Sequence, residues 1–272
     1  MMNDARAGRF FAHGVMITLS LLAIFPVYWM VQTSFRPENT VFSTGLFPTA
    51  PTLDNYRAVI EAMPIFRIIW NTFVMAGATA IAQVATGLLA AWALVRWRFP
   101  GGRLVHSLIA LSWLVPFQVV MIPNYVLATR LGLLDSLAGL VIPNAAAAIA
   151  VLVIYNAMRG FPREVVEAAR MDGTSSLRTL LEVVLPNMRA PLASVGILCF
   201  ISAWNDYFWP LLLIRRMENS VVQIGLQFFM TQEGNDWGLL MAAATLASLP
   251  ILILYLVLQR QIVDSFMKSG IR

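Results

Sequence analysis

Residues 159–189 read RGFPREVVEAARMDGTSSLRTLLEVVLPNMR, and they form a polar stretch in a chain that is otherwise almost continuously apolar. Five arginines and four acidic residues fall within it, between two long hydrophobic segments. Charged side chains are costly inside a hydrocarbon environment and are rare there. The stretch therefore predicts a surface segment, on one side of a membrane, at which the chain meets water-soluble partners.

The first half of this stretch is typical of a short amphipathic helix followed by a sharp turn. Pro162 suits the first turn of a helix, where its missing N–H costs no hydrogen bond. Residues 163–171 then separate valine, alanine and methionine side chains from arginine and glutamate side chains. Gly173 follows, and glycine readily takes the left-handed conformation with which many helices end.

The second half predicts another short helix. Thr174 or Ser175 can cap it, and we expect it to end at Pro186. The alternative is a plain solvated connection between two membrane helices. Such connections are commonly only about 2 to 8 residues long, so this long and patterned segment favours a docking surface.

The composition places the chain among helical membrane proteins. Of its 272 residues, 59% are hydrophobic and 12% are charged, whereas typical soluble domains carry about 25% charged residues. The mean hydropathy is +0.73. The net charge of +5 is explained by the placement of basic residues around a membrane, and it requires no nucleic-acid partner.

Six stretches are long enough to cross a hydrocarbon core of about 30 Å. They cover residues 10–34, 68–95, 104–129, 137–158, 190–214 and 238–260. We expect an all-α membrane protein that forms a single transmembrane domain over residues 1–272. The interval 35–67 is the longest polar one outside residues 159–189, and its residues 54–62 predict a short helix capped by Asp54.

Basic residues are distributed unequally between the two sides of this arrangement. If the N-terminus lies in the cytoplasm, the inner segments hold thirteen arginines and lysines and the outer segments hold six. The inner set is Arg6, Arg9, Arg96, Arg98, Arg103, Arg159, Arg163, Arg170, Arg178, Arg189, Arg260, Lys268 and Arg272, and the outer set is Arg36, Arg57, Arg67, Arg130, Arg215 and Arg216. Cytoplasmic segments of membrane proteins are enriched in these residues. We therefore expect both termini and residues 159–189 on the cytoplasmic side.

The sequence contains no motif for metal binding or for nucleotide binding. The single cysteine, Cys199, lies in an apolar run, and we interpret it as a small buried hydrophobe. His13 and His106 stand alone, so the sequence has no histidine–cysteine cluster with the spacing of a metal site. It also has no GxxxxGK[ST] loop for nucleotide phosphates. We expect no catalytic residue, metal or cofactor on this chain, and no enzyme activity of its own.

The polar stretch carries a longer motif, E-A-A-x3-G-x9-[I/V]-x-L-P, at Glu167, Ala168, Ala169, Gly173, Val183, Leu185 and Pro186. This motif resembles the signature loop of the membrane subunits of bacterial ABC importers. Four further patterns extend the resemblance along the chain: DNY at 54–56, AWALVRWRFPG at 91–101, AWNDY at 203–207 and QRQIVDSFMKSG at 259–270. Together they are similar to the smaller, six-span permease of carbohydrate-type importers, a group that includes maltose-type and glycerol-phosphate-type systems.

The resemblance implies a type I importer permease in which residues 159–189 form a coupling loop between the fourth and fifth spans. A short helix, roughly residues 164–173, would dock into a cleft of an ATPase subunit. The coupling residues would be Glu164, Glu167, Ala168, Ala169, Met171, Asp172 and Gly173. In this arrangement Glu167 would contact a basic residue of the ATPase, the two alanines would permit close approach, and Gly173 would form the turn.

The same resemblance implies the rest of the assembly. A second permease subunit would pair with this chain as a heterodimer, and two ATPase subunits would bind ATP and Mg. An extracytoplasmic substrate-binding protein would deliver a small polar substrate to the outer segments 35–67 and 215–237; a solvated cap over the helix ends is the alternative role for residues 35–67. The chain would be a multi-pass protein of a bacterial inner or plasma membrane, in contact with the lipid bilayer.

Polar residues within the spans mark candidates for the substrate pathway, because such residues tend to face a cavity or a partner helix. The strongest are Trp204, Asn205, Asp206 and Tyr207, since aromatic rings beside amides suit sugar recognition. Alternatively, the aromatic rings mark the outer membrane interface, while Asn205 and Asp206 satisfy backbone groups at a helix bend before Pro210. Weaker candidates are Asn71, Gln83, Gln118, Asn124 and Asn144.

Uptake of a sugar or oligosaccharide is the leading function. A glycerol phosphate, a glycerophosphodiester or an amino sugar is the alternative substrate for the same role. A stand-alone secondary transporter would need charge pairs inside the membrane, yet Asp206 is the one acid deep in an apolar run. An integral membrane enzyme would need clustered histidine, aspartate or glutamate, and the acids here are scattered.

Overall fold

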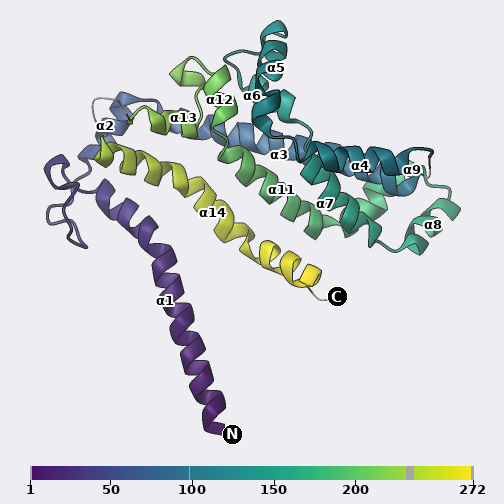
Figure 1. Cartoon of the computed structure of the whole chain (residues 1–272), viewed down its shortest axis with the longest axis horizontal. Coiled ribbons are helices and arrows are strands. Elements are labelled where there is room, and N and C mark those ends of the chain that lie inside the picture. The colour runs from purple at the N-terminus through teal and green to yellow at the C-terminus, as the bar shows by residue number, and fades with distance from the viewer. Residues whose placement is uncertain (1, 98, 231–235, 271–272) are drawn as a thin grey trace. The chain divides into compact units, whose positions relative to one another are not determined.

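The structure is a computed structural model that describes residues 2–97, 99–230 and 236–270 (Figure 1). Over these residues the chain is helical and contains no β-strand, which confirms the predicted all-α class. Arg98 and Arg272, which contribute to the predicted charge asymmetry, lie outside the described residues. The α-helices are α1 Met2–Ser34, α2 Asp54–Ala62, α3 Ile65–Arg96, α4 Gly102–Ser112, α5 Phe117–Arg130, α6 Leu137–Val141, α7 Ala148–Arg159, α8 Arg163–Met171, α9 Ser176–Arg178, α10 Leu185–Asn187, α11 Arg189–Trp204, α12 Phe208–Leu213, α13 Val222–Gln227 and α14 Trp237–Gly270. Four short elements of other helical types are η1 Glu38–Thr40, η2 Ile142–Asn144, η3 Thr179–Val184 and η4 Met217–Asn219.

The chain divides into two compact units. One unit combines residues 1–65 with residues 225–249, and the other combines residues 66–224 with residues 250–272. The second unit holds both the polar stretch and the candidate pathway residues, so the functional description below concerns that unit.

Three of the described helices are long and apolar enough to cross a membrane by themselves. They are Phe11–Ser34 within α1, Ile65–Arg96 (α3) and Trp237–Val257 within α14. These helices coincide with the predicted first, second and sixth spans. Because each hydrogen bond of a helix closes within the same segment, such helices satisfy their backbone groups without water.

Three further candidate spans are bent pairs of helices, which would bring the number to six if each pair crosses the membrane once. The pairs are α4 with α5, bent by 96°, Leu137–Asn144 with α7, bent by 48°, and Ser176–Asn187 with α11, bent by 84°. The first two bends fall within the expected spans 104–129 and 137–158, whereas the third, at Met188, lies just before the expected span 190–214.

One of the breaks lies at a proline. Pro116 precedes α5 with an extended backbone (ψ 134°), and a proline disfavours helical geometry at the residue before it. At the second break, the backbone becomes extended at Ala147 (φ −129°, ψ 127°) directly before α7, whereas Pro143 lies within η2. The predicted span 190–214 is interrupted differently, because α11 ends at Trp204 and α12 begins only at Phe208.

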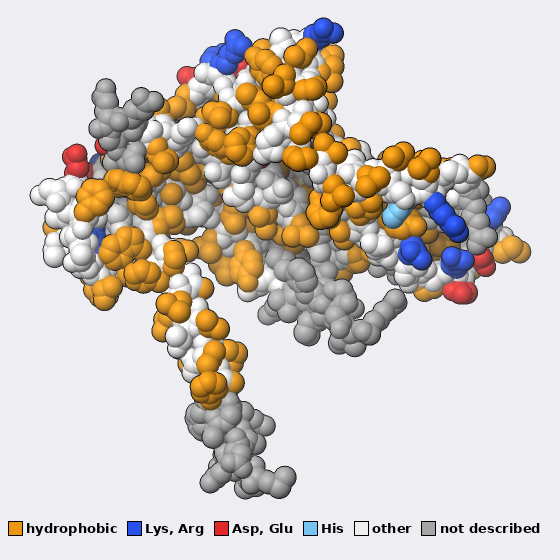
Figure 2. All heavy atoms as spheres, viewed as in Figure 1, with side chains coloured by type: hydrophobic (Ala, Val, Ile, Leu, Met, Phe, Trp, Pro, Cys, Tyr) orange, Lys and Arg blue, Asp and Glu red, His pale blue; other side chains and the backbone are white. Residues whose placement is uncertain are grey.

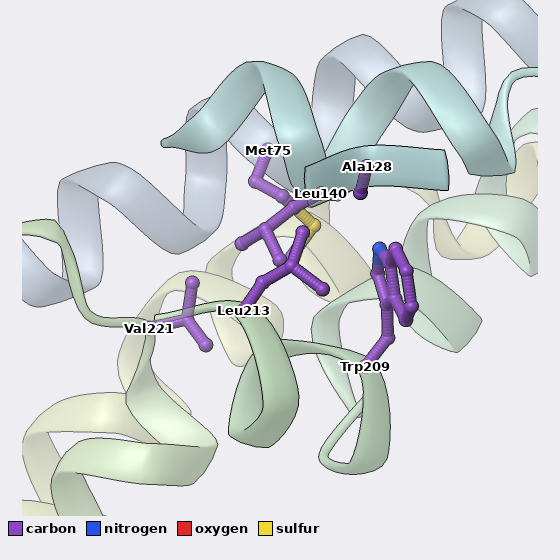
Figure 3. Packing of buried hydrophobic residues seen from close by; sticks show 6 residues of the cluster. All are labelled: Met75, Ala128, Leu140, Trp209, Leu213 and Val221. Carbon is purple, nitrogen blue, oxygen red and sulfur yellow. The ribbon is translucent and has the colours of Figure 1, made fainter. Parts of the chain in front are cut away.

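A hydrophobic cluster joins these broken helices. It consists of Met75, Ala128, Leu140, Trp209, Leu213 and Val221, whose side chains come from α3, α5, α6, α12 and the segment before α13 (Figure 3). The indole Nε1 of Trp209 donates to the carbonyl of Gly139 at 3.1 Å. A Cβ at Gly139 would lie 2.1 Å from the carbonyl oxygen of Leu133, so only glycine fits there. This packing fixes the position of α12 and of the pathway candidates that precede it.

The polar interval 35–67 folds around a buried arginine in the first unit. Arg36 is 0% exposed; its Nε donates to Gln32 Oε1 at 2.8 Å, and its terminal nitrogens donate to Ser43 and to the carbonyl of Gly45. The predicted helix over residues 54–62 is confirmed as α2. The predicted cap is wrong: Leu53 precedes the helix, and Asp54 is its first residue.

Candidate functional site

The polar stretch contains an exposed helix between two turns. α8 begins directly after Pro162, as the sequence predicts, and ends at Met171. Six of the seven predicted coupling residues are exposed, with Met171 at 88%. They are Glu164, Glu167, Ala168, Met171, Asp172 and Gly173. The seventh, Ala169, is only 9% exposed, so it packs against its own chain and leaves the other six facing outward.

The turn after α8 is fixed by backbone hydrogen bonds. Gly173 has φ +77°, the left-handed conformation predicted for it. Its N–H donates to the carbonyl of Arg170 at 3.0 Å, and the N–H of Thr174 donates to the carbonyl of Ala169 at 3.2 Å. This pair of bonds defines a Schellman motif. A Cβ at Gly173 would meet no atom within 4 Å, so the backbone conformation alone calls for glycine within this chain.

The second helical segment begins as predicted and ends later. Ser175 Oγ accepts a hydrogen bond from the N–H of Arg178 at 3.4 Å and so caps α9. The helical path continues through η3 and α10 to Asn187, so the predicted end at Pro186 is wrong. Pro186 lies inside this continuous helical path, as the second residue of α10.

A buried tryptophan connects this loop to a membrane helix. Trp92, near the end of α3, is 4% exposed, and its Nε1 donates to Ser176 Oγ at 3.1 Å. Trp92 also lines a pocket of about 350 Å³ together with Glu167 and Arg170 of α8. The sequence motif at 91–101 contains Trp92, but nothing in that pattern predicted its role. The signal available in the sequence was a large indole side chain among alanines, close to the end of a predicted span.

A polar pocket lies where the broken helices meet. Its volume is about 300 Å³. Its polar and charged lining residues are Thr79, Gln83, Gln118, Asn144, Ser202 and Asp206. Asp206 is the one charged residue among the described residues that line it. The side chains of Phe117 and Phe208 supply aromatic surface. Hydroxyl, amide, carboxylate and aromatic groups thus face one small space.

The hydrogen bonding of the pocket leaves some of these groups available. Gln83 Nε2 donates to the carbonyl of Asn144 at 2.8 Å, and Asn144 Nδ2 donates to the carbonyl of Leu140 at 3.0 Å. The hydroxyl of Thr79 is buried and has no hydrogen-bond partner in the described part of the chain. A buried polar atom of this kind calls for a bound water or ligand.

The structure separates the four strongest pathway candidates. Only Asp206 lines the pocket. Trp204 is 3% exposed and stacks on Phe200, with ring centroids 5.7 Å apart. Asn205 Nδ2 donates to the carbonyl of Ile201 at 2.9 Å, which matches the helix-bend role considered for it. Tyr207 contacts Phe208 edge-on at 5.4 Å.

The weaker candidates for the substrate pathway also fall into two groups, those that line the pocket and those that do not. Gln83, Gln118 and Asn144 line the pocket, whereas Asn71 uses its Nδ2 to bind the carbonyls of Glu218 at 2.9 Å and Ser220 at 3.0 Å. Asn124 does not line the pocket. Thr79 and Ser202 were missed by sequence reasoning, because a hydroxyl in an apolar helix commonly binds its own backbone.

An aspartate organises the turn between α5 and α6. Asp135 has φ 52°, and its carboxylate accepts hydrogen bonds from the backbone N–H groups of Arg215 and Arg216, each at 3.1 Å. The side chains of Arg216 and Asn219 also donate to it. Burial by itself would raise the pKa of Asp135, but these hydrogen bonds outweigh it and hold the pKa well below its usual range. The ionised carboxylate thus fastens the segment after α12 to the α5–α6 turn.

Bent candidate spans around a polar pocket, together with an exposed charged helix whose following turn is hydrogen-bonded to α3, are typical of a membrane permease subunit that works with soluble partners. The chain belongs to the family of binding-protein-dependent transport system inner membrane components, whose family model matches residues 83–268. It is therefore a permease subunit of an ABC importer and not an enzyme, and it works in a complex with an ATPase and a binding protein.

The similar proteins include characterised importer subunits. The chain is 30% identical, over 99% of both sequences, to the sn-glycerol-3-phosphate transport system permease protein UgpE of Salmonella choleraesuis. It is 27% identical to the arabinooligosaccharides transport system permease protein AraQ of Bacillus subtilis, over 93% of this chain and 92% of AraQ. Its fold matches a chain of a bacterial ABC transporter involved in the import of the acidic polysaccharide alginate, with a TM-score of 0.82, 24% identity, and coverage of 94% of this chain and 97% of that chain.

Proposed function

We propose that this chain forms half of the translocation pathway for a neutral sugar or oligosaccharide and couples it to ATP hydrolysis through α8. The observation that carries the coupling role is the exposed, charged α8, which ends in a Schellman turn that the Trp92–Ser176 hydrogen bond ties to α3 just beyond it. A docking helix must present its partner-facing side chains rigidly, because a mobile contact would absorb the movement that it should transmit. Six exposed residues from Glu164 to Gly173 would form the docking surface.

The polar pocket supports the choice of solute. Hydroxyl and amide groups can exchange hydrogen bonds with sugar hydroxyls, and Phe117 and Phe208 offer surfaces against which a sugar ring can stack. Asp206 accepts hydrogen bonds from hydroxyl groups but repels a phosphate. The pocket therefore favours a neutral polyol over an anion.

A glycerol phosphate is the second candidate, and the observation in its favour is the similarity to UgpE. That similarity, 30% identity over 99% of both chains, exceeds the 27% identity to AraQ. If this solute is carried, cationic groups of the partner permease would have to neutralise it. The two candidates thus differ in the sign of charge that the pathway must accommodate.

The remaining assembly follows from the importer class. A second permease would complete the pathway as a heterodimer, and two ATPase subunits would bind ATP and Mg, so that this chain needs no cofactor. The thirteen-to-six distribution of basic residues supports cytoplasmic termini and a cytoplasmic α8. The polar interval 35–67, shaped by Arg36, would face the binding protein.

The coupling role is tested by reversing one charge on α8. The complex is purified through a tag on this chain, and the ATPase recovered with it is measured. Glu167→Lys should reduce ATPase recovery at least about tenfold, because a basic residue of the ATPase would then meet a like charge. Glu61→Lys on α2 is a matched control with the same change of charge at another exposed site, and its ATPase recovery should equal that of the unmodified chain. Equal recovery for both variants would overturn the docking role.

The solute is tested separately in proteoliposomes that contain the complete complex. ATP-driven uptake of labelled neutral oligosaccharides is compared with uptake of labelled glycerol 3-phosphate. We expect uptake of a neutral sugar, and Asp206→Asn should raise its KM. Uptake of glycerol 3-phosphate alone would overturn the choice of solute while leaving the coupling role intact.

A further inference from the structure

A basic pocket is formed by the end of α3, the start of α4 and the end of α7. Its volume is about 910 Å³. Its charged lining residues are Arg103, Arg159 and Arg163, and no acidic residue is among the described residues that line it. Figure 2 shows basic side chains gathered beside a histidine over the part of the molecule that Figure 1 labels α4, α7 and α8. Several guanidinium groups without a carboxylate make this pocket attractive to an anion.

His106 supplies a polar group without a partner. Its Nε2 atom is buried and has no hydrogen-bond partner among the described residues. Its ring lies against Tyr155, with ring centroids 4.4 Å apart. The guanidinium carbon of Arg159 lies 5.9 Å from the centroid of the same Tyr155 ring, which is within cation–π range. One tyrosine therefore orients two of the groups that line the pocket.

An apolar stripe on α4 adjoins the basic pocket. Leu104, Leu108 and Leu111 are 63%, 54% and 57% exposed. Their spacing places them on one side of the helix, and α4 also carries Arg103 and His106. Trp97, which lines the pocket, is 51% exposed, and tryptophan is enriched at the membrane–water interface. A free anion would make no contact with this apolar stripe, whereas the acyl chains of a lipid would cover it.

We propose that this pocket binds the phosphate headgroup of an anionic phospholipid. Arg103 and Arg159 pair with the phosphate oxygens, and the N–H of His106 Nε2 donates to one of them. The acyl chains lie along the leucine stripe of α4. This inference is independent of the solute that the importer carries.

The test uses the complete complex, purified through a tag on this chain and exchanged into nanodiscs. Retained lipid is measured by native mass spectrometry in phosphatidylglycerol and in phosphatidylcholine. The complex should retain phosphatidylglycerol preferentially. Removal of one basic residue should weaken retention roughly fivefold, so Arg103→Gln combined with Arg159→Gln should weaken it roughly 25-fold.

Matched variants separate this site from general electrostatic attraction. Arg57→Gln combined with Arg130→Gln removes the same charge from two other exposed arginines and should leave lipid retention unchanged. His106→Phe keeps an aromatic ring at this position but loses the Nε2 donor, and it should weaken retention about three- to tenfold. The melting temperature of each variant in phosphatidylcholine checks that the fold is intact.

Four results would overturn the proposal. One is equal retention of the two lipids by the unmodified complex. Another is undiminished retention of phosphatidylglycerol by the Arg103→Gln, Arg159→Gln variant. Displacement of the lipid by millimolar inorganic phosphate would assign the pocket to a free anion. Loss of the ATPase from that variant with unchanged lipid retention would assign the pocket to an acidic segment of the ATPase.

Discussion

The indole Nε1 of Trp92 donates a hydrogen bond to Ser176 Oγ at 3.1 Å, across 84 positions of sequence. Trp92 belongs to the membrane helix α3, and Ser176 is the first residue of the helix that follows the turn after α8. The bond therefore ties the polar stretch to a span. Under the proposed coupling role, displacement of α8 by an ATPase would reach α3 through this contact.

Replacement of either partner should destabilise the permease. Ser176→Ala leaves the buried indole N–H unpaired, which costs about 1 to 3 kcal/mol. Trp92→Phe removes the donor together with part of the buried ring surface. Because both changes delete the same bond, the double variant should lose less stability than the sum of the two single losses. The stability losses of the two single variants and of the double variant are measured by the melting temperature of the complex in detergent.

Trp113→Phe is the matched control, because Trp113 is 59% exposed. We expect a change within about 0.5 kcal/mol for this variant. Fully additive losses for the Trp92 and Ser176 variants would show that the bond contributes nothing in the folded protein.

Gly173 allows backbone strain to be distinguished from contact with a partner. Its φ of +77° penalises any residue with a Cβ, although no atom of this chain lies within 4 Å of that position. Gly173→Ala should therefore cost about 1 kcal/mol of stability, and Gly173→Asn should cost less, because asparagine tolerates the left-handed region. Thermal unfolding of the purified complex gives this order.

ATPase recovery gives the second readout for the same variants. If the docking surface includes Gly173, the larger side chain of Gly173→Asn should reduce recovery more than that of Gly173→Ala, which reverses the order of the stabilities. Recovery that follows stability instead would confine Gly173 to a structural role.

The turn at Gly173 was predictable because its cause is local. Helix end, left-handed glycine and cap lie within a few residues of one another, so the sequence at that point contains the necessary information. The breaks in the predicted spans were harder to predict from the sequence. Pro116 lies at the break before α5, whereas Pro26 and Pro250 lie inside α1 and α14, and the surrounding packing decides between these outcomes.

The pathway residues depend on contacts that are distant in sequence. Asn71 and Gln83 are both amides on α3, yet Asn71 binds carbonyls near position 219 while Gln83 lines the polar pocket. Residue type could identify both as candidates, but it could not separate them. The pocket itself draws on residues from Met75 to Phe208, and its existence follows from how the broken helices pack.

Asp135 makes stability depend on pH in a defined direction. Its pKa is lowered in the folded protein, so its contribution is complete above about pH 4, the ordinary pKa of aspartate. The contribution is lost as the pH falls below that value toward the lowered folded pKa. Asp135→Asn should therefore melt at a lower temperature than the unmodified protein at pH 7, and the difference should persist at pH 5 and shrink below about pH 4.

Asp54→Asn is the control for this titration. Asp54 is 75% exposed and lies 3.5 Å from Arg57, and such surface pairs contribute little. Its melting temperature should match that of the unmodified protein at every pH. A constant difference between Asp135→Asn and the unmodified protein down to pH 3 would contradict the assigned direction of the pKa.

Thr79 offers a test in which stability and transport should change in opposite senses. Its buried hydroxyl lines the polar pocket and has no partner among the described residues. Thr79→Val removes an unsatisfied group at nearly constant volume, so the free energy of unfolding should stay equal or rise by about 1 to 3 kcal/mol. If that hydroxyl binds the transported solute, the KM for uptake should rise about three- to tenfold. Thermal unfolding and proteoliposome uptake provide the two measurements.

Thr72→Val, on the same helix, should have the opposite effect: lower stability with an unchanged KM for uptake. The hydroxyl of Thr72 donates to the carbonyl of Ile68 at 2.7 Å and accepts from the N–H of Val222 at 2.9 Å. Its removal leaves that N–H unpaired and should cost about 1 to 3 kcal/mol, with an unchanged KM for uptake by the surviving complex. A threonine whose bonds are complete stabilises the fold, whereas one that faces the pocket with a free hydroxyl stabilises a bound solute. An unchanged KM for Thr79→Val would remove that residue from the pathway and leave its unpaired hydroxyl a structural cost.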